Sequence, residues 1–404
     1  MLISTYKMEI IKNYLKYSLW LVLIVFAALF GLHWLPAITI DGHTMRRVDL
    51  LSDLRYPKQE VAVADSDTIP LPPVVKPVFV DTCRAGMTCI EDYGDSTRRG
   101  MASFYEALDR TSSSHPDHDG LVRIAVFGDS FIEADIFTAD LREMLQKRFG
   151  GCGVGFVTIT SMTSGYRPTV RHTFGGWSSH AVTDSVYFDK KKQGISGHYF
   201  IPREGAYVEL RGQSKYASLL DTCQQASIFF YNKDSVHLTA RVNRGESKNY
   251  SLAPSGDLQK ISVEGRIGSV RWTVDRADST LFYGLAMDGK KGIILDNFSL
   301  RGSSGLSLRG IPQQMLRQFN EQRPYDLIIL EYGLNVATER GRNYDNYQKG
   351  LLTSIEHLKN CFPQASLLLL SVGDRDYKTE DGELRTMPGA VSYTHLTLPT
   401  NREV

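Results

Sequence analysis

The sequence predicts a mixed α/β fold in which a parallel-sheet domain is interrupted by an all-β module. Two flanks of the chain, 81–150 and 292–390, alternate apolar runs with stretches of helical periodicity, which is typical of βα units on a parallel sheet. Residues 151–291 instead carry short runs of β-forming residues separated by Gly, Asn, Asp and Pro, which favours a sandwich or jelly roll. An apolar N-terminal segment adds a predicted transmembrane helix.

Composition is that of an ordinary globular chain. The sequence has 404 residues, a formal net charge of +1 and 42% hydrophobic residues, which suits about two domains. The near-zero charge gives no electrostatic support for nucleic-acid binding. Five cysteines without a CxxC pair argue against a zinc ribbon or a thioredoxin-type site, and we expect no metal ion.

The N-terminal segment from Ser18 to Ala37 is apolar apart from Ser18 and His33, and is long enough to cross a bilayer at ~1.5 Å per residue. Lysines precede it in the stretch 1–17, so the positive-inside tendency places that stretch in the cytoplasm and exports the rest. A cleaved signal peptide is the alternative, but no small-x-small cleavage site follows the run. We expect an uncleaved anchor, with the catalytic domain on the periplasmic or extracellular side.

The stretch 38–80 is polar and then proline-rich, which is typical of an extended linker. Cys83 and Cys89 follow it. In an exported protein this pair could close a small disulfide loop, and two separately buried thiols are the alternative. The sequence leaves both possibilities open.

The first flank contains the turn from Gly128 to Ser130 (Gly-Asp-Ser), preceded by the buried strand Ile124–Phe127. A helix is predicted from Ile132 to about Phe149, because apolar residues recur there at helical spacing. Such a strand–turn–helix places the turn at the carboxyl edge of a sheet, where open α/β folds bind ligands. Ser130 is therefore a candidate nucleophile near a helix N-terminus, and a simple helix cap is the alternative.

The middle region 151–291 is expected to form an independent module, whose excision would leave a foldable α/β domain. Its predicted strands are Ser185–Phe188, Tyr207–Leu210, Ser227–Tyr231, Val236–Val242, Ile261–Val263, Val270–Val274 and Leu281–Leu285. Three of its aromatic residues, Tyr166, Trp177 and Tyr199, either stack on sugar rings or belong to the core.

The second flank returns to alternating strands and helices. The predicted elements are the strand Ile293–Leu300, the helix Pro312–Gln322, the strand Leu327–Leu330, the helix Tyr344–Asn360 and the strand Ser366–Val372. A glycine-rich loop containing Gly302 follows the first of these strands, and a segment containing Asn335 follows the second.

Three strand ends thus carry a serine, a glycine-rich loop and an asparagine in that order, and this arrangement resembles the SGNH, or GDSL, hydrolase family. The turn with Ser130 matches the family's nucleophile block. Gly302 is similar to the glycine whose backbone N–H lines the oxyanion hole, and Asn335 to the asparagine whose side chain donates to the oxyanion. In the family an aspartate usually follows this asparagine, whereas this sequence has Val336 at that position. The resemblance implies a flavodoxin-like three-layer domain with Ser130, Gly302 and Asn335 as catalytic residues.

The resemblance covers about residues 83–149 and 292–390, and the inserted module is similar to that of some polysaccharide and peptidoglycan O-acetylesterases of the family. It implies an exported serine esterase that deacetylates cell-wall or other polysaccharide through an acyl-enzyme on Ser130, without metal or organic cofactor. A polysaccharide O-acetyltransferase, and a membrane-tethered glycan-binding protein with an inert hydrolase domain, are the alternatives. No Gly-x-Ser-x-Gly elbow occurs, which disfavours an α/β-hydrolase.

The family's fourth block, a C-terminal Asp-x-x-His that supplies the base, is missing. The stretch from Asp234 to His237 has this pattern but lies within the predicted module, out of order. His395 follows Ser392 where the aspartate belongs, and the tail 391–404 resembles a translated adapter from sequencing-library preparation. We therefore expect a hydrolase domain that is incomplete at its C-terminus, and a chain that is inactive as written because Ser130 lacks a base.

Overall fold

The structure is a computed structural model that describes residues 16–25, 27, 39–40, 43–44, 90, 100–111, 120–184, 187–338, 343–371, 373, 376–379 and 382–386. The chain divides into two compact units, Met1–Ala85 and Gly86–Val404. Several predictions fall outside the described residues: Cys83 and Cys89, His395 with the rest of the tail 391–404, and most of the linker.

In the first unit, residues 16–25 are helical, and β1 (Thr39–Ile40) pairs with β2 (His43–Thr44). Within the part of the chain that the structure describes, no helix is both long and apolar enough to cross a membrane. The predicted anchor extends over residues 26 and 28–37, which lie outside that part.

The second unit is built on a parallel sheet with the order β13-β3-β14-β15. The strands are β3 (Leu121–Gly128), β13 (Gly292–Ser299), β14 (Leu327–Glu331) and β15 (Ser366–Leu370). All three strand pairs are parallel, which confirms the prediction from alternating strands and helices. In chain order the first strand of this sheet, β3, lies between the second, β13, and the third, β14. This is the strand order of flavodoxin-like doubly wound folds.

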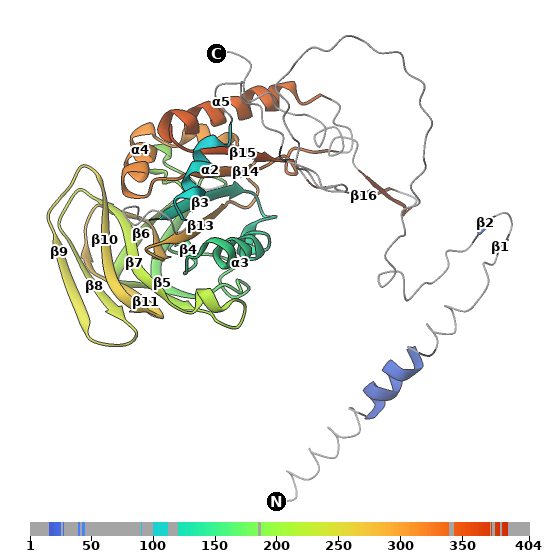
Figure 1. Ribbon diagram of the computed structural model, residues 1–404, viewed down its shortest axis with the longest axis horizontal. Helices are drawn as coiled ribbons and strands as arrows, with labels where there is room; N and C mark the ends of the chain where they lie inside the picture. Colours follow the sequence, from blue (N-terminus) through green and yellow to red (C-terminus); the bar gives the residue numbers. More distant parts are fainter. Residues whose placement is uncertain are drawn as a thin grey trace, which may run out of the picture. The chain divides into compact units, whose positions relative to one another are not determined.

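Helices cover both faces of this sheet (Figure 1). Alternate residues of β3 point to opposite faces, as the strand period requires. Ile124 and Val126 pack with α2 (Ala102–Asp109) and α3 (Thr138–Phe149). Phe127 lies on the other face, in one core cluster with α4 (Gln313–Gln322) and α5 (Asp345–Cys361).

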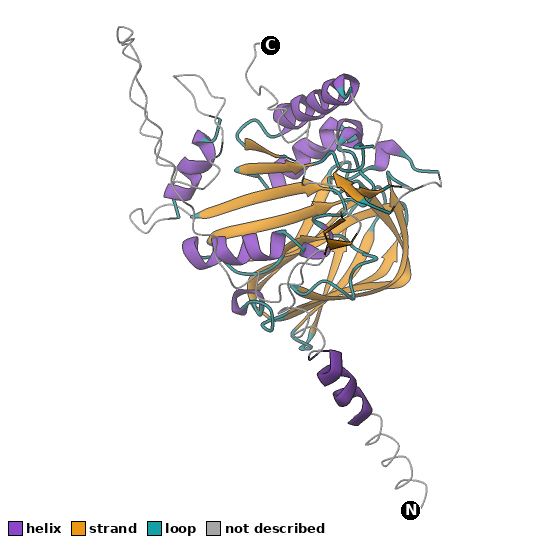
Figure 2. Ribbon diagram, turned by 90° about the vertical axis from the view of Figure 1, so that its right-hand side faces the viewer, coloured by secondary structure: helices purple, strands orange, loops and turns teal. Residues whose placement is uncertain are grey.

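The module is a nine-stranded antiparallel sheet that curls back on itself (Figure 2). Its strands are β4 (Gly155–Val157), β5 (Val170–Ala181), β6 (His198–Gly212), β7 (Cys223–Asn232), β8 (Val236–Val242), β9 (Ser247–Leu252), β10 (Leu258–Ile267), β11 (Ser269–Ala277) and β12 (Thr280–Asp288). We call β10-β7-β12-β4 the inner layer and β5-β6-β11-β8-β9 the outer layer. The two layers are joined where β12 pairs with β6, through the single residue pair Phe282 and Phe200.

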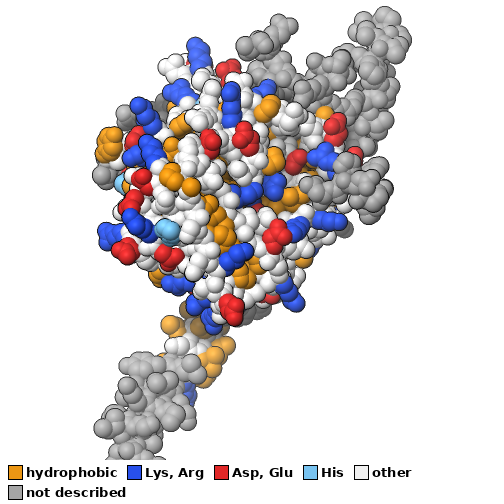
Figure 3. Space-filling view, turned by 90° about the vertical axis from the view of Figure 1, so that its left-hand side faces the viewer, with side chains coloured by type: hydrophobic (Ala, Val, Ile, Leu, Met, Phe, Trp, Pro, Cys, Tyr) orange, Lys and Arg blue, Asp and Glu red, His pale blue; other side chains and the backbone are white. Residues whose placement is uncertain are grey.

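The two layers enclose a core to which the inner layer contributes Ile228 and Phe230 and the outer layer contributes Val208 and Trp272. The predicted strand at 185–188 is wrong, since the described Tyr187 and Phe188 belong to no strand. The predictions missed β4, β5 and β9, because glycines and polar residues dilute their apolar alternation. On the side that carries β8, β9 and β10, the surface mixes basic, acidic and neutral side chains (Figure 3).

The module and the α/β domain share a core, so the prediction of an independent module is wrong. Phe156 and Phe229 of the inner layer pack against Phe298 of β13 and Phe319 of α4, with ring centroids 5.2 Å apart for Phe156–Phe298 and 5.5 Å for Phe229–Phe319. The sequence could not show this, because the inner layer is apolar on both faces and one of those faces belongs to the neighbouring domain.

The chain enters and leaves the module through two segments in contact. Ile293 donates a backbone hydrogen bond to the carbonyl of Gly150 (2.9 Å). Gly151 has a φ of +115°, and a Cβ there would lie 2.4 Å from the Ile293 oxygen. Only glycine fits both the conformation and this approach, which accounts for the glycine-rich stretch 150–155.

Shorter elements complete the unit. They are the 3-10 turns η2 (Glu133–Asp135), η3 (Lys190–Lys192), η4 (Ser218–Leu220) and η5 (Leu306–Gly310), and the strand pair β16 (Asp376–Lys378) and β17 (Leu384–Thr386).

Candidate active site

Three neighbouring strands end at the same edge of the parallel sheet. Gly128 at the end of β3 is in register with Ser299 at the end of β13 and with Glu331 at the end of β14. The segments that follow these strands carry the predicted residues Ser130, Gly302 and Asn335. The predicted order of blocks therefore becomes a spatial cluster, because parallel strands present their carboxyl ends together.

Asn335 links the other two segments by hydrogen bonds. Its side-chain Nδ2 donates to Asp129 Oδ2 (3.0 Å) and to the backbone oxygen of Ser303 (2.9 Å). Asp129 is buried, and its Oδ1 accepts a hydrogen bond from the backbone N–H of Phe131 (2.8 Å). The aspartate of the Gly-Asp-Ser turn thus holds the turn on one side and the asparagine on the other.

The predicted oxyanion donors are only partly arranged for that role. Gly302 has a φ of +75°, and nothing lies within 4 Å of where a Cβ would be, so its surroundings are open. Both hydrogens of the Asn335 amide are directed at protein oxygens, and one must be released before Asn335 can donate to a substrate. Among the described residues, the hydroxyl of Ser130 has no hydrogen-bond partner.

Glu331 is a residue of this edge that sequence reasoning missed. It ends the buried strand β14, is 8% exposed, and its Oε2 has no hydrogen-bond partner within the described residues. Burial, and then the charge of Asp129, raises the pKa of Glu331 to about 7. The signal was present in the sequence, as a single carboxylate that ends an otherwise apolar strand.

The loop after Ser130 is held by a buried ionic cluster around Asp135. The Asp135 carboxylate accepts hydrogen bonds from Arg142 (3.2 Å), Arg167 (2.8 Å) and Asn297 (2.9 Å). Burial alone would raise the pKa of Asp135, but the two guanidinium groups hold it well below its ordinary value. Because Arg167 belongs to the module and Asn297 to β13, the cluster joins the loop after Ser130 to both.

This cluster explains why the helix predicted from Ile132 begins only at Thr138. Ala134 and Asp135 have φ values of 57° and 63°, left-handed conformations that interrupt a helix and are held by the surrounding contacts. Two of the apolar residues whose helical spacing led to that prediction, Ile136 and Met144, are both 69% exposed, so the apolar face that the spacing implied is wrong in part.

The buried face of α3 is instead largely polar. Arg142 Nε donates to the backbone oxygen of Leu295 (3.1 Å), and Gln146 Nε2 donates to that of Ile293 (3.2 Å). These side chains are buried because β13 lies directly against the helix and provides hydrogen-bond acceptors. Helical periodicity alone could not reveal such partners.

The remaining sequence candidates lie elsewhere in the module. His237 is on β8, where its Nδ1 is 2.9 Å from Ser251 Oγ. Tyr199 is buried, Trp177 packs on Phe282 with ring centroids 5.1 Å apart, and only Tyr166, at 85% exposed, presents its ring to solvent.

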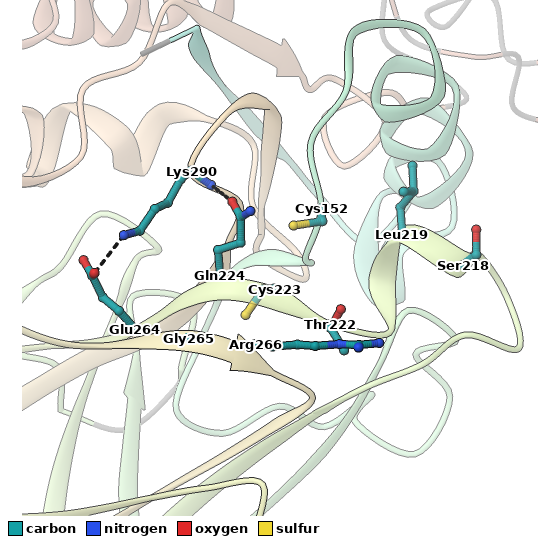
Figure 4. A pocket seen from close by; sticks show the side chains of 10 residues that line it. All are labelled: Cys152, Ser218, Leu219, Thr222, Cys223, Gln224, Glu264, Gly265, Arg266 and Lys290. Atoms are coloured by element: carbon teal, nitrogen blue, oxygen red, sulfur yellow. Dashed lines mark hydrogen bonds and ion pairs between the residues drawn. The ribbon is translucent and has the colours of Figure 1, made fainter.

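A cavity of about 820 Å³ lies in the module and does not include the candidate site. Cys152, Cys223, Glu264, Arg266 and Lys290 are among its lining residues, and Lys290 forms an ion pair with Glu264 (2.7 Å; Figure 4). None of Ser130, Gly302 or Asn335 lines it. Among the described residues, no group of three or more His, Cys, Asp or Glu side chains could hold a metal ion.

The fold is similar to that of a solved esterase. A structure described as peptidoglycan O-acetylesterase in action matches with a TM-score of 0.60 and 17% sequence identity, over 76% of this chain and 81% of its own. At this identity the likeness concerns the fold alone. No family model matches the sequence, and a search of curated proteins gives no match.

Two further matches have TM-scores of 0.21, too low to indicate a shared fold. One is a family two carbohydrate esterase from Cellvibrio japonicus, at 10% identity over 59% of this chain and 82% of its own. The other is a variant of a family 29 carbohydrate-binding module, at 11% identity over 34% of this chain and 92% of its own.

Proposed function

We propose that the intact protein is an SGNH-type serine esterase that removes acetyl groups from cell-wall or another polysaccharide. The observation that carries the proposal is the junction at the sheet edge, where Asn335 binds both the turn that contains Ser130 and the loop that contains Gly302. The overlap in fold with a peptidoglycan O-acetylesterase supports it.

In this mechanism the Ser130 hydroxyl attacks the carbonyl carbon of the acetyl ester while a base accepts its proton. The backbone N–H groups of Ser130 and Gly302, with the Asn335 amide, stabilise the negative charge on the carbonyl oxygen. Removing one donor from such an oxyanion hole costs about 2.7–4 kcal/mol of transition-state stabilisation. The C–O bond then breaks, the polysaccharide hydroxyl leaves with the proton, and water hydrolyses acetyl-Ser130.

Among the described residues, no side chain is hydrogen-bonded to the Ser130 hydroxyl as a base would be, and the lack of a base should slow the reaction by roughly 10²–10⁴. Added imidazole can replace a missing histidine base. We expect the chain to release little acetate from an O-acetylated polysaccharide, and more when imidazole is added. The Ser130→Ala variant should show only the background rate of imidazole itself. Equal acetate release by both proteins would contradict the proposal, and acetyl transfer to an added glycan without acetate release would assign a transferase.

We also propose that the protein is exported and anchored by its N-terminal segment. The apolar stretch 18–37 and the preceding lysines support this proposal. Expressed with its N-terminus intact, the protein should fractionate with membranes, and its N-terminal sequence should begin before residue 18. A mature N-terminus after residue 30 would instead show a cleaved signal peptide.

A further inference from the structure

The outward face of the outer layer carries four arginines in adjacent positions. Burial alternates along the strands, so that Val208, Leu210, Val270 and Trp272 face the module core and their neighbours face solvent. Arg171 of β5, Arg211 of β6 and Arg241 of β8 are exposed, and the side chain of Arg271 of β11 is 33% exposed. We call these four residues the arginine face.

Strand register places the four arginines in one continuous row. Arg171 lies directly opposite Arg211, and Arg271 lies directly opposite Arg241. Arg211 and Arg271 are diagonal neighbours, because Arg211 is opposite Ser269. Four strands spaced ~4.8 Å apart make the row about 14 Å wide, which is the scale of a short oligosaccharide.

This arrangement opposes the stability of the sheet. Like charges directly opposite each other on neighbouring strands are destabilising, and the face contains two such pairs. Only Arg271 is compensated, by an ion pair with Glu209 (3.4 Å) and by stacking 3.7 Å from the centre of the Tyr207 ring. Among the described residues, no carboxylate lies within 4 Å of the other three guanidinium groups. Such uncompensated charge points to a ligand that supplies the missing anions.

We propose that the arginine face binds an acidic polysaccharide through its carboxylate groups. Guanidinium groups bind carboxylates through two parallel hydrogen bonds. The same face carries polar side chains suited to sugar hydroxyls: Thr239 Oγ1 is bonded to Asp275 (2.6 Å) and Asn249 (3.0 Å), and Ser251 is bonded to His237 (2.9 Å). The inference rests on the proposed function for its choice of polymer, and it would give the module the task of holding the substrate.

Two other polyanions fit the face less well. A nucleic-acid-binding chain is generally basic overall, whereas this chain has a formal net charge of +1. A peripheral membrane site needs apolar side chains that enter the bilayer, and on the arginine face the strand positions between the arginines are polar, such as Thr173 and Thr273. A carboxylated glycan needs neither property.

The test is retardation of the purified full chain in gels that contain polygalacturonate, with dextran as the neutral polymer. We expect polygalacturonate alone to retard the chain, and Arg211→Gln or Arg241→Gln to weaken binding roughly tenfold. The matched control is Arg203→Gln, an exposed arginine near the other end of β6. The melting temperatures of Arg211→Gln and Arg241→Gln should stay level or rise, because each of these two variants relieves a like-charge pair.

Four results would overturn the proposal. They are no retardation by polygalacturonate, equal weakening in Arg203→Gln, a marked fall in melting temperature in the two face variants, or tighter binding of DNA or of phosphatidylglycerol vesicles than of polygalacturonate. Binding is measured without turnover, and Ser130 does not belong to the face. A failure of esterase activity would therefore leave this result intact, and the reverse also holds.

Discussion

The seam between the module and the α/β sheet and the carboxyl edge of that sheet are built in opposite ways. At the seam, buried Arg323 bonds to Asp288 of β12 and to Asp296 of β13, and Tyr325 also donates to Asp296 (2.6 Å). At the edge, by contrast, Glu331 Oε2 is buried and has no hydrogen-bond partner among the described residues. Natural proteins satisfy nearly all of their buried polar groups, so a buried carboxylate oxygen without a partner, such as Glu331 Oε2, is destabilising.

This contrast predicts the largest loss of stability at the seam. Arg323→Met would leave Asp288 and Asp296 buried without their shared cation. Removing one partner of a buried ion pair typically costs about 3–5 kcal/mol. The control is Arg110→Met, which breaks the more exposed pair with Asp326 and should cost less than about 1 kcal/mol. Urea unfolding measures both, and equal effects would show that the seam is no more stabilising than the surface.

Asp135 tests whether the seam extends to the loop after Ser130. Asp135→Asn leaves Arg142 and Arg167 without their buried carboxylate and should cost about 2–4 kcal/mol. Hydrogen exchange of the amides at 131–137 should also become faster, whereas Asp140→Asn on the exposed side of α3 should leave it unchanged. Unchanged exchange in Asp135→Asn would mean that the cluster does not hold this loop.

Glu331 should produce a smaller effect that depends on pH. Its pKa of about 7 in the folded protein lies above the ordinary value of 4.5. Between pH 4.5 and pH 7, Glu331 is therefore protonated in the folded state and ionised in the unfolded state. Stability from this group is therefore present below about pH 4.5 and lost as the pH rises to about 7. Glu331→Gln should be level with the wild type at pH 4.5 and more stable by about 1–3 kcal/mol at pH 8.

Comparing Glu331→Gln with the wild type isolates the effect of Glu331. Carboxylates whose pKa is lowered in the folded state, such as Asp135, make stability rise with pH instead, but they are present in both proteins and cancel in the comparison. Urea unfolding across this pH range provides the measurement. A difference that does not change with pH would show that folding does not raise the pKa of Glu331.

The features that could be predicted from the sequence are those that depend on local patterns, and the features that could not depend on contacts between distant segments. Runs such as Leu327–Leu330 and Val236–Val242 became strands where expected, because local patterns determine buried strands. The order of the three blocks was also readable, since each follows such a run. The cluster at Asp135 was not, because Asp135 and Asn297 are 162 residues apart in sequence. The pairing of Arg171 with Arg211 was hidden for the same reason, since register depends on the assembled sheet.

Acylation of Ser130 tests the central claim most directly. The chain is incubated with p-nitrophenyl acetate and imidazole, quenched in acid, and mapped by mass spectrometry of its peptides. Our account predicts an acetyl group on the peptide that contains Ser130, and its absence from that peptide in Ser130→Ala. An unmodified Ser130 peptide, or the same level of acetylation on the corresponding peptide of the alanine variant, would contradict the assignment of Ser130 as the nucleophile.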